Sequence, residues 1–440
     1  MNKPIKTLTF PGDKSIAHRL VLLSLLVNKK ILIKNLPDSQ DVCSSLDIVK
    51  TLGVEVSKIE DSKTVVLKPL DKKDFGKEEI VLDCGNSGTT ARLLCGILAN
   101  LKGKFKLIGD ESLSKRPMER VVRPLADLMG VNISSTDGHL PIYIEANGKT
   151  KATDFFNQTG SAQVKSAVLF AGMAAEGNTI VREKTLSRDH TERLLDYLLF
   201  TQQNGGQSAC STLFSSAIPQ VICHCEQSKI GWHSRITDDC LEFCVPGDIS
   251  SAAYFIVWGA ITGKKLEIEN VLLNPTRTGF ISVLRRMGAE IEVQIKEDVW
   301  EPIGDIFVKG GNLKSTDIQA DEIPSLIDEL PILAVAMAFA KGKSRVSGAS
   351  ELRVKESDRI SCLVSQLKKA GINCCEYEDG YEICGENKII STELESFNDH
   401  RLAMSFAILS KCSKADIKVK DRDSVRISFP EFYNYLENNN

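Results

Sequence analysis

The chain has 440 residues, with 55 Lys and Arg against 58 Asp and Glu and a formal net charge of −3 at pH 7. At roughly 150 residues per domain the length corresponds to about two or three domains, and 42% apolar with 26% charged residues is typical of globular proteins. This composition excludes a disordered or fibrous chain. The near-neutral charge argues against general nucleic-acid binding, so an anion site would need positive charge concentrated locally.

One pattern recurs six times along the chain. A helical segment of small and apolar residues is followed by a short basic or Gly-containing turn and a β-rich run, and in most copies a second helix and another strand come next. The first helices begin near His18, Thr90, Gln163, Ser250, Leu330 and His400. The intervals are too long for a solenoid, whose repeats have about 20–50 residues. The pattern favours a βαβαββ unit used six times, three per domain; the alternative is an ordinary α/β chain with irregular spacing.

The remaining elements follow from the same pattern. Second helices are predicted at residues 42–52, 118–129, 191–199, 278–287 and 358–370, and several end in a glycine suited to the position after a helix. Strands are predicted at residues 31–33, 54–56, 131–133, 179–181, 266–268, 291–293 and 417–419. Residues 201–244 break the pattern, and we interpret them as a loop and a candidate domain junction.

The break contains a group of cysteine and histidine residues: Cys210, Cys223, His224, Cys225, His233, Cys240 and Cys244. Their spacing does not match a common zinc pattern, so we expect no metal site; Cys223 and Cys225 resemble one face of a strand. Thirteen cysteines in so long a chain are not a disulfide framework. The chain start lacks the apolar run of a signal peptide, and no apolar stretch approaches the ~20 residues that span a bilayer. We therefore expect a reduced, cytoplasmic protein.

Polar sets stand at the predicted helix starts, at residues 11–15, 85–92, 161–163, 187–190, 351–359 and 398–401. Free backbone N–H groups and the helix dipole attract anions at such positions, and Lys14 and Arg19 add charge at the first of them. The set at residues 85–92 is not a Walker motif, because its Gly-Lys-Ser/Thr end is missing. Solvated helix caps are the simpler interpretation of any single set. Six sets together favour a shared anion-binding site.

Asp328 stands beside a strongly apolar run that begins at Leu330. A carboxylate at such an edge could have a raised pKa and act as a general base. A helix N-terminus with Pro331 in its first turn explains the residue equally well, and the two roles can coexist.

Taken together, these segments resemble the EPSP synthase family, the enolpyruvyl transferases of the shikimate pathway. The matching segments cover nearly the whole chain and lie at residues 11–19, 85–92, 115–118, 161–163, 187–192, 246–252, 274–277, 353–359, 398–401 and 429–430. The resemblance implies an α/β fold of two domains, each with three βαβαββ repeats arranged as an inside-out α/β barrel, and an active site in the interdomain cleft. One domain would comprise residues 1–12 and 246–440, and the other residues 13–245.

The resemblance also implies two adjoining substrate sites. Shikimate 3-phosphate would be bound by Lys14, Ser15, Arg19, Ser161, Ala162, Gln163, Arg188, Asp328 and Lys355. Phosphoenolpyruvate would be bound by Lys14, Asn86, Gly88, Arg116, Gln163, Arg359, Arg401 and Arg426. The catalytic residues would be Asp328, Glu356, Lys14 and His400.

In this family the 5-hydroxyl of shikimate 3-phosphate attacks C2 of phosphoenolpyruvate while C3 is protonated, and the tetrahedral intermediate expels phosphate. Asp328 would take the hydroxyl proton, and Glu356 would deliver and later remove the C3 proton. Lys14 and the arginines would stabilise developing charge, and domain closure would exclude water. The resemblance implies that no organic cofactor or metal is needed. It also implies a monomer whose partners are the two small-molecule substrates, with no binding to nucleic acid or to a membrane. It also implies inhibition by glyphosate, which competes with phosphoenolpyruvate, because Gly88 leaves that pocket open.

The chain departs from the family at a few positions. Ala162 stands where other members have a second Ser, and Glu351 and His18 each stand where many members have Asn. Arg426 is the nearest counterpart of a Lys found in the family, and Arg and Lys are not interchangeable. One alternative is a UDP-N-acetylglucosamine 1-carboxyvinyltransferase, but residues 115–117 contain no cysteine and Ser15 follows Lys14 where that enzyme has Asn. Another is a binding or scaffold protein of the same fold without catalysis, and an RNA-end cyclase is a third.

Overall fold

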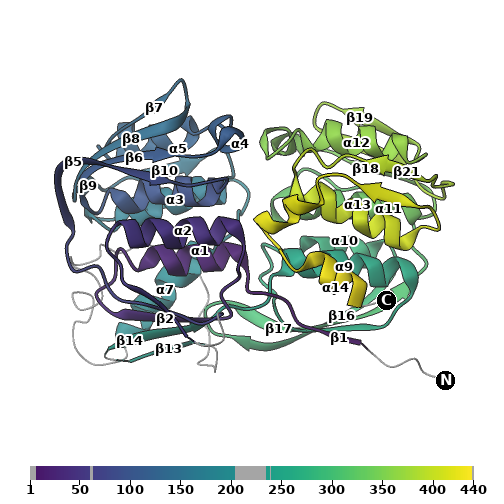
Figure 1. The fold of residues 1–440 in the computed structure, drawn as a ribbon, viewed down its shortest axis with the longest axis horizontal. Coiled ribbons are helices and arrows are strands. Elements are labelled where there is room, and N and C mark those ends of the chain that lie inside the picture. The colour runs from purple at the N-terminus through teal and green to yellow at the C-terminus, as the bar shows by residue number, and fades with distance from the viewer. Residues whose placement is uncertain (1–5, 60–62, 204–233, 238, 439–440) are drawn as a thin grey trace. The chain divides into compact units, whose positions relative to one another are not determined.

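The computed structural model describes residues 6–59, 63–203, 234–237 and 239–438, which form two compact units (Figure 1). The N-terminal unit comprises Gly12–Val245 and Asp298–Glu301. The C-terminal unit comprises Met1–Pro11, Pro246–Glu297 and Pro302–Asn440. The chain therefore starts in the C-terminal unit, forms the N-terminal unit, and then returns.

In the N-terminal unit, three helices are the first helices of the repeats: α1 (Lys14–Leu23), α3 (Gly88–Leu98) and α6 (Ala162–Gly172). The others are α2 (Gln40–Thr51), α4 (Glu111–Ser114), α5 (Glu119–Arg123) with the π-helix η1 (Pro124–Leu128), and α7 (His190–Gln203). A five-stranded sheet has the order β13 (Ser234–Ile236), β14 (Cys240–Cys244), β2 (Lys30–Lys34), β4 (Val65–Leu67), β3 (Val56–Lys58). A four-stranded sheet has the order β5 (Asp74–Asp83), β6 (Lys102–Ile108), β8 (His139–Asn147), β7 (Asn132–Thr136). Two parallel strand pairs also belong to this unit: β10 (Asp154–Asn157) with β12 (Ile180–Glu183), and β9 (Thr150–Lys151) with β11 (Ala175–Glu176).

Side-chain caps and close packing position the first helices of this unit. Asp13 accepts a hydrogen bond from the backbone N–H of Ile16 at 3.0 Å and so caps α1. Ser87 caps α3 in the same way. Helices α3 and α6 are in close contact, because a Cβ built on Gly96 would lie 2.0 Å from the carbonyl oxygen of Ala167. Only glycine fits this close approach of the two helices.

The C-terminal unit repeats the arrangement. Its first helices are α9 (Ile249–Thr262), α11 (Leu330–Phe339) and α13 (His400–Cys412), which pack against one another, and its others are α10 (Gly279–Arg286), α12 (Arg359–Lys369) and α14 (Phe432–Asn438). The sheets have the orders β1 (Lys6–Leu8), β15 (Leu266–Leu272), β17 (Pro302–Gly311), β16 (Ala289–Asp298), and β18 (Lys343–Val346), β20 (Gly380–Cys384), β19 (Cys374–Tyr377). Strands β21 (Thr392–Leu394) and β22 (Ile417–Val419) form a pair. The short helices are η2 (Ile323–Ser325), η3 (Ile327–Glu329), η4 (Ser350–Val354) and η5 (Arg422–Ile427).

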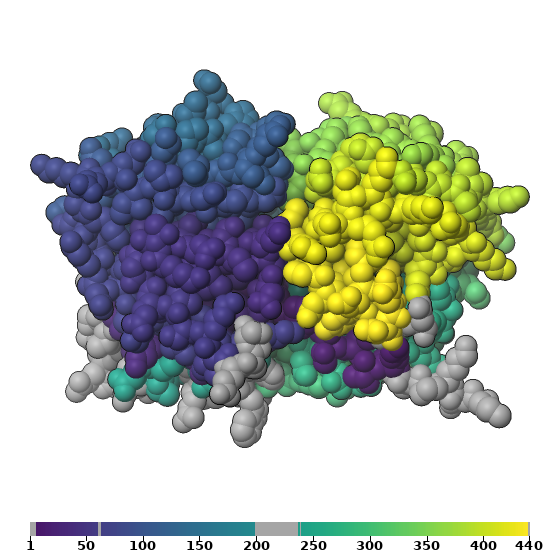
Figure 2. All heavy atoms as spheres, in the orientation of Figure 1, coloured from purple at the N-terminus to yellow at the C-terminus, as the bar shows by residue number. Residues whose placement is uncertain are grey.

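The two ends of the chain meet in the C-terminal unit. Strand β1 pairs in parallel with β15, and the ammonium of Lys6 donates to the carbonyl oxygen of Asn438 at 2.9 Å. The ring of Phe10 stacks on Tyr435 with centroids 5.7 Å apart. Figure 2 shows the same neighbourhood at the surface, with purple N-terminal residues below the yellow C-terminal ones. The first residues thus complete the unit formed by the second half of the chain.

The predicted helix positions are confirmed, since each of the six predicted first-helix starts lies in or begins α1, α3, α6, α9, α11 or α13. The loop interpretation of residues 201–244 is wrong where the structure describes them. Helix α7 continues to Gln203, and β14 pairs in parallel with β2, which lies about 200 residues earlier in the chain. Most of the predicted cysteine and histidine group, including Cys223 and Cys225, lies outside the described residues.

Candidate functional site

Lys14 opens helix α1, and its ammonium lies 2.7 Å from Oδ2 of Asp41 on α2. Both side chains are largely buried, at 17% and 9% exposure. Because the carboxylate holds the ammonium at the helix start, Lys14 has a defined position rather than a freely moving one. Sequence reasoning missed Asp41, since its contact with Lys14 depends on the packing of α1 against α2.

Arg19 lies on α1 beneath the starts of two other helices. Its Nε donates to Oγ1 of Thr191 at 2.8 Å, its Nη2 to Oγ of Ser166 at 3.0 Å, and its Nη1 to the carbonyl oxygen of Ser15 at 2.8 Å. Burial lowers the pKa of Arg19 to about 10, although Glu192 and Asp13 oppose this effect. The guanidinium therefore stays charged at neutral pH and joins α1, α6 and α7. Arg188, just before α7, is half-buried and close enough to influence Arg19 electrostatically.

Asn86, Gly88 and Arg116 gather at the start of α3. Nη2 of Arg116 donates to Oδ1 of Asn86 at 2.6 Å. A Cβ on Gly88 would lie 2.9 Å from Nη1 of Arg92 and 3.3 Å from Nη1 of Arg116. Two buried guanidinium groups therefore lie beside a residue without a side chain, and this arrangement suits the binding of a small anion. Arg92 is a second residue that the predicted site lacked.

Ser161, Ala162 and Gln163 form the start of α6, where Ser161 is the residue before the helix. The amide of Gln163 accepts from Nη1 of Arg92 at 2.6 Å and donates to Oγ1 of Thr89 at 3.0 Å. The start of α6 is therefore linked by hydrogen bonds to the start of α3. We call Lys14, Ser15, Arg19, Asn86, Gly88, Arg92, Arg116, Ser161, Ala162, Gln163 and Arg188 the N-terminal cluster.

A buried ion pair orders the edge of this cluster. Lys165 lies 2.7 Å from carboxylate oxygens of both Glu183 and Glu192. Glu183 also accepts from Oγ of Ser187 at 2.7 Å and from Asn157, whose amide in turn donates to the carbonyl oxygen of Ser161. Burial favours the neutral acid, but Lys165 and the hydrogen bonds from Ser187 outweigh it and lower the pKa of Glu183. Glu183 thus fixes the backbone on which Ser161 and Arg188 stand.

In the C-terminal unit, Arg359 begins α12 and is 1% exposed. Its Nε donates to Oδ2 of Asp399 at 2.7 Å, and its Nη2 to Oε2 of Glu356 at 2.5 Å. Burial opposes the charge, but the carboxylates of Asp399 and Glu356 outweigh it and raise the pKa of Arg359 above its ordinary value. Glu356 is therefore held by a permanently charged partner.

Asp328, in η3 just before α11, lies between two arginines. Its Oδ1 is 3.5 Å from Nη1 of Arg359, and its Oδ2 is 3.5 Å from Nη2 of Arg401. Nη1 of Arg401 also donates to the carbonyl oxygen of Asp328 at 3.1 Å. The sequence predicts Asp328 at an apolar edge, whereas in the structure its carboxyl group lies between two guanidinium groups.

The other predicted residues of this unit take different positions. His400 begins α13 and is 1% exposed, and Lys355 is half-buried next to Glu356. Arg426, an exposed side chain on η5, forms an ion pair with Asp423 at 3.7 Å. We call Asp328, Lys355, Glu356, Arg359, His400 and Arg401 the C-terminal cluster.

The contacts described for the arginines differ between the two clusters, although Lys14 of the N-terminal cluster also pairs with a carboxylate, that of Asp41. The hydrogen bonds described above for Arg19, Arg92 and Arg116 go to hydroxyl, carbonyl and amide oxygens. The two arginines of the C-terminal cluster instead face four carboxylates, those of Asp328, Glu329, Glu356 and Asp399. The sequence predicted positive charge in both groups. The structure shows that an anion at the C-terminal cluster must compete with carboxylates already paired to the arginines.

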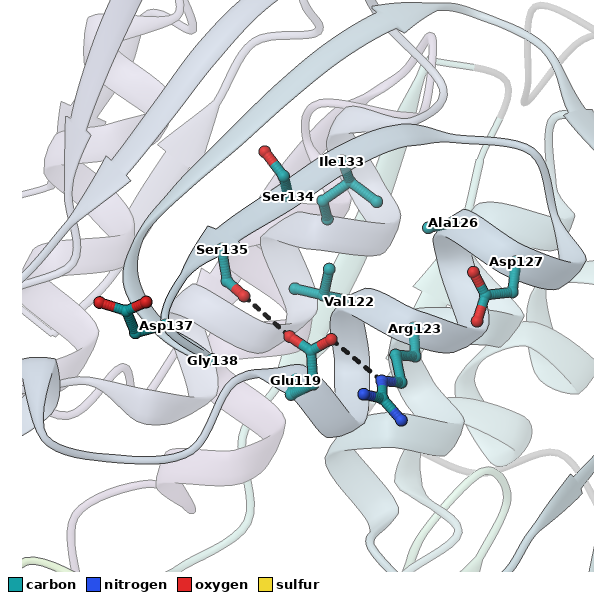
Figure 3. Close-up of a pocket in the computed structure, with 10 residues that line it drawn as sticks. All are labelled: Glu119, Val122, Arg123, Ala126, Asp127, Ile133, Ser134, Ser135, Asp137 and Gly138. Atoms are coloured by element: carbon teal, nitrogen blue, oxygen red, sulfur yellow. Dashed lines mark hydrogen bonds and ion pairs between the residues drawn. The ribbon is translucent and has the colours of Figure 1, made fainter.

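A separate pocket of about 780 Å³ lies in the N-terminal unit, between α5, η1 and β7 (Figure 3). Glu119 lines it and joins Oγ of Ser135 at 2.8 Å to Nε of Arg123 at 3.0 Å. None of its lining residues belongs to either cluster. This pocket is therefore not the candidate site.

Across the described stretches of the chain, no group of three His, Cys, Asp or Glu side chains is arranged to hold a metal ion. Burial raises the pKa of the Cys95 thiol on α3 to about 12, so it is not a nucleophile at neutral pH. Among the described helices, none has the length and apolar character needed to cross a membrane.

Known proteins of similar sequence and fold supply an independent comparison. The model of the EPSP synthase (3-phosphoshikimate 1-carboxyvinyltransferase) family matches residues 3–200 and 231–436. A 3-phosphoshikimate 1-carboxyvinyltransferase of Thermodesulfovibrio yellowstonii is 42% identical, covering 99% of this chain and 98% of the relative. A 3-phosphoshikimate 1-carboxyvinyltransferase of Alkaliphilus metalliredigens is 41% identical, covering 98% of this chain and 96% of the relative.

Two solved structures have a similar fold. The EPSP synthase of Acinetobacter baumannii superposes with a TM-score of 0.76 at 34% identity, covering all of this chain and 96% of that one. The enolpyruvyl transferase NikO of Streptomyces tendae superposes with a TM-score of 0.71 at 14% identity, covering 99% and 94%, which shows a shared fold alone.

Proposed function

The chain belongs to the EPSP synthase family, and we propose that its two clusters perform the family's reaction on shikimate 3-phosphate and phosphoenolpyruvate. The activity is transfer of the enolpyruvyl group to the 5-hydroxyl of shikimate 3-phosphate, with release of phosphate. The observation that supports the proposed residue roles most strongly is Asp328, held between Arg359 and Arg401 beside Glu356. This arrangement offers a general base, a proton carrier and two anion-binding groups in one place.

Shikimate 3-phosphate would be bound by the residues at the starts of α1 and α6 and before α7. Ser15 and Ser161 offer hydroxyl groups, Gln163 an amide, and Arg19 and Arg188 positive charge. Helix N-termini favour a phosphate group, because their backbone N–H groups point toward it. Arg19 joins these three elements through Thr191 and Ser166, and this supports a common ligand for them. Ala162 would contribute its backbone, and Lys14, Asp328 and Lys355 would complete the set.

Phosphoenolpyruvate carries a phosphate and a carboxylate, and would need several cationic groups. Arg116, with Asn86 and Gly88, offers one position for an anionic group, and Arg359 with Arg401 offers the other. Gln163, bonded to Arg92, would lie beside both substrates, and Lys14 would contact both. We assign Arg426 to this set on the family resemblance alone, because its described ion pair is with Asp423.

The proton transfers follow from the carboxylates. Asp328 would take the proton of the 5-hydroxyl as its oxygen bonds to C2 of phosphoenolpyruvate. Glu356 would give a proton to C3, which becomes a methyl group in the tetrahedral intermediate. Phosphate then leaves C2 as Glu356 takes a proton back from C3, restoring the double bond. Lys14, His400 and the arginines would stabilise the charge that develops on the phosphate.

We also propose that the enzyme acts as a monomer in the cytoplasm, binds no nucleic acid, and needs neither metal nor organic cofactor. Activity that survives dialysis against a chelator, and elution at about the 48.4 kDa mass of one chain in gel filtration, would support this. Transfer to UDP-N-acetylglucosamine is not favoured, since the family model and the relatives belong to 3-phosphoshikimate 1-carboxyvinyltransferases.

A phosphate-release assay tests the function. Phosphoenolpyruvate is supplied with shikimate 3-phosphate in one reaction and with UDP-N-acetylglucosamine in another. We expect release only in the first, and a strong loss in Asp328→Asn. Release only with the nucleotide sugar, or no release with either acceptor from a folded protein, would contradict the proposal.

A further inference from the structure

Glu329 follows Asp328 in the chain but is turned into the interior of the C-terminal unit. It is 1% exposed, and its described contacts are with Ser250 and Arg401. Its Oε1 accepts from Oγ of Ser250 at 2.5 Å and lies 3.6 Å from Nη1 of Arg401. Its Oε2 is buried without a hydrogen-bond partner among the described residues. The carboxyl group is therefore buried, with the guanidinium of Arg401 beside it.

Ser250 is itself fixed by a second buried arginine. Nη2 of Arg277, a residue 2% exposed, donates to Oγ of Ser250 at 2.8 Å and lies 3.7 Å from Oδ1 of Asp248. Asp248 in turn caps α9 by accepting from the backbone N–H of Ser250 at 2.7 Å. A continuous chain of contacts thus runs from Asp248 to Arg401.

This chain of contacts contains two sequence motifs to which the proposed reaction gives no role. Residues 246–252 contain Asp248 and Ser250, and residues 274–277 end in Arg277. Neither motif supplies a residue to the N-terminal or C-terminal cluster. Their polar side chains are buried, and buried polar groups are costly unless they hold one another in place. What they hold, through Glu329, is the guanidinium of Arg401.

We propose that Glu329 is a positioning residue for Arg401, supported by Ser250 and Arg277. Arg401 has two anchors on one side, the Glu329 carboxylate and the carbonyl oxygen of Asp328. With Nη1 fixed by both, Nη2 is oriented toward the Asp328 carboxylate, where the proposed reaction takes place. The inference rests on the proposed function, because it assigns Arg401 to phosphoenolpyruvate.

The test compares Glu329→Gln with wild type in steady-state kinetics for each substrate separately. Glutamine keeps the shape of the side chain but removes its charge. We expect KM for phosphoenolpyruvate to rise about tenfold, the size of one weakened charge-assisted hydrogen bond, while KM for shikimate 3-phosphate and kcat change less than about twofold. Glu329→Asp, which keeps the charge, should recover part of the loss.

Asp305→Asn is the matched control. Asp305 is a buried carboxylate in the same unit that pairs with Lys296 at 2.7 Å and lies outside the chain of contacts from Asp248 to Arg401. This variant should keep both KM values. If Glu329→Gln does not fold, Ser250→Ala, which removes the hydroxyl bound to Oε1, decides the question with a smaller rise in the same KM.

Unchanged KM for phosphoenolpyruvate in a folded variant would overturn the inference. Equal losses for both substrates, or the same losses in Asp305→Asn, would also overturn it and indicate a purely structural role. Because wild-type turnover is measured first, absence of turnover there would contradict the proposed function, whereas an unaffected variant of an active enzyme would contradict only the role of Glu329.

Discussion

Nη2 of Arg359 lies 2.5 Å from Oε2 of Glu356, within the first turn that leads into α12. The same guanidinium binds Asp399 through Nε at 2.7 Å, so its position is fixed from two sides. The Glu356 side chain is thereby oriented, and it is 18% exposed, which leaves it reachable by substrate. This geometry suits a group that must give a proton to carbon and take one back.

Glu356→Gln should reduce kcat by about 10²–10⁴-fold, the range of general acid–base catalysis, with KM values changed only a few-fold. Glutamine keeps the shape of the side chain but cannot carry the proton. Steady-state phosphate release measures both parameters. The control is Glu393→Gln, which removes an exposed carboxylate paired with Lys420 in the same unit. A variant that lost substrate binding but kept its turnover rate would contradict the assigned role.

Asp41→Asn should lower kcat/KM for phosphoenolpyruvate by roughly tenfold, because Lys14 loses the carboxylate that holds its ammonium. The matched control is Asp47→Asn on the same helix, an exposed carboxylate paired with Lys50, which should leave activity unchanged. Equal effects of the two substitutions would show that Asp41 acts on helix α2 rather than on Lys14.

Gly88→Ala should raise both KM for phosphoenolpyruvate and the inhibition constant for glyphosate. The added methyl group would lie 2.9 Å from Nη1 of Arg92, so that guanidinium must move. KM for shikimate 3-phosphate should stay within about twofold, since binding of that substrate is assigned to other helix starts. Inhibition kinetics against phosphoenolpyruvate measure all three constants. A variant with unaltered KM and inhibition constant would show that no anion binds beside Gly88.

His18→Asn should make the N-terminal unit less sensitive to acid. Burial, and then the charges of Lys14 and Arg19, hold the pKa of His18 well below 6.5. Below about pH 6.5 the unfolded chain takes up a proton that the folded one refuses, so stability falls as pH falls. The wild type should therefore lose up to ~1.4 kcal/mol per pH unit more than the variant in this range. Denaturant unfolding at pH 7 and pH 5 measures the difference, and parallel losses in both proteins would contradict it.

The helices were predictable because their signals are local. Caps such as Asp13 and Ser87, glycines after the second helices, and turn residues all lie within a few positions of the element that they define. Strand β14 was missed because its partner β2 lies far away in sequence and no local signal names it. Tertiary pairing decided the structure there.

The candidate site, like the fold, was predictable only where its signals are local in the sequence. The sequence names residues at helix starts, but it cannot show which side chains contact them from other elements. Asp41, Arg92 and Glu329 were missed for this reason, since each acts on a predicted residue through packing between helices or loops. The sequence predicted positive charge at Arg359 and Arg401 but not the carboxylates that pair with them, because those carboxylates come from three separate segments.

Deuterium incorporation tests the central claim most directly. In the proposed mechanism, C3 of phosphoenolpyruvate becomes a methyl group before phosphate leaves. The reaction is run with shikimate 3-phosphate in D₂O, and the product is examined by mass spectrometry. We predict deuterium in the enolpyruvyl methylene group of the product, formed at a rate that Glu356→Gln greatly reduces. A product that forms at the normal rate without any deuterium would contradict the addition and elimination assigned to Asp328 and Glu356.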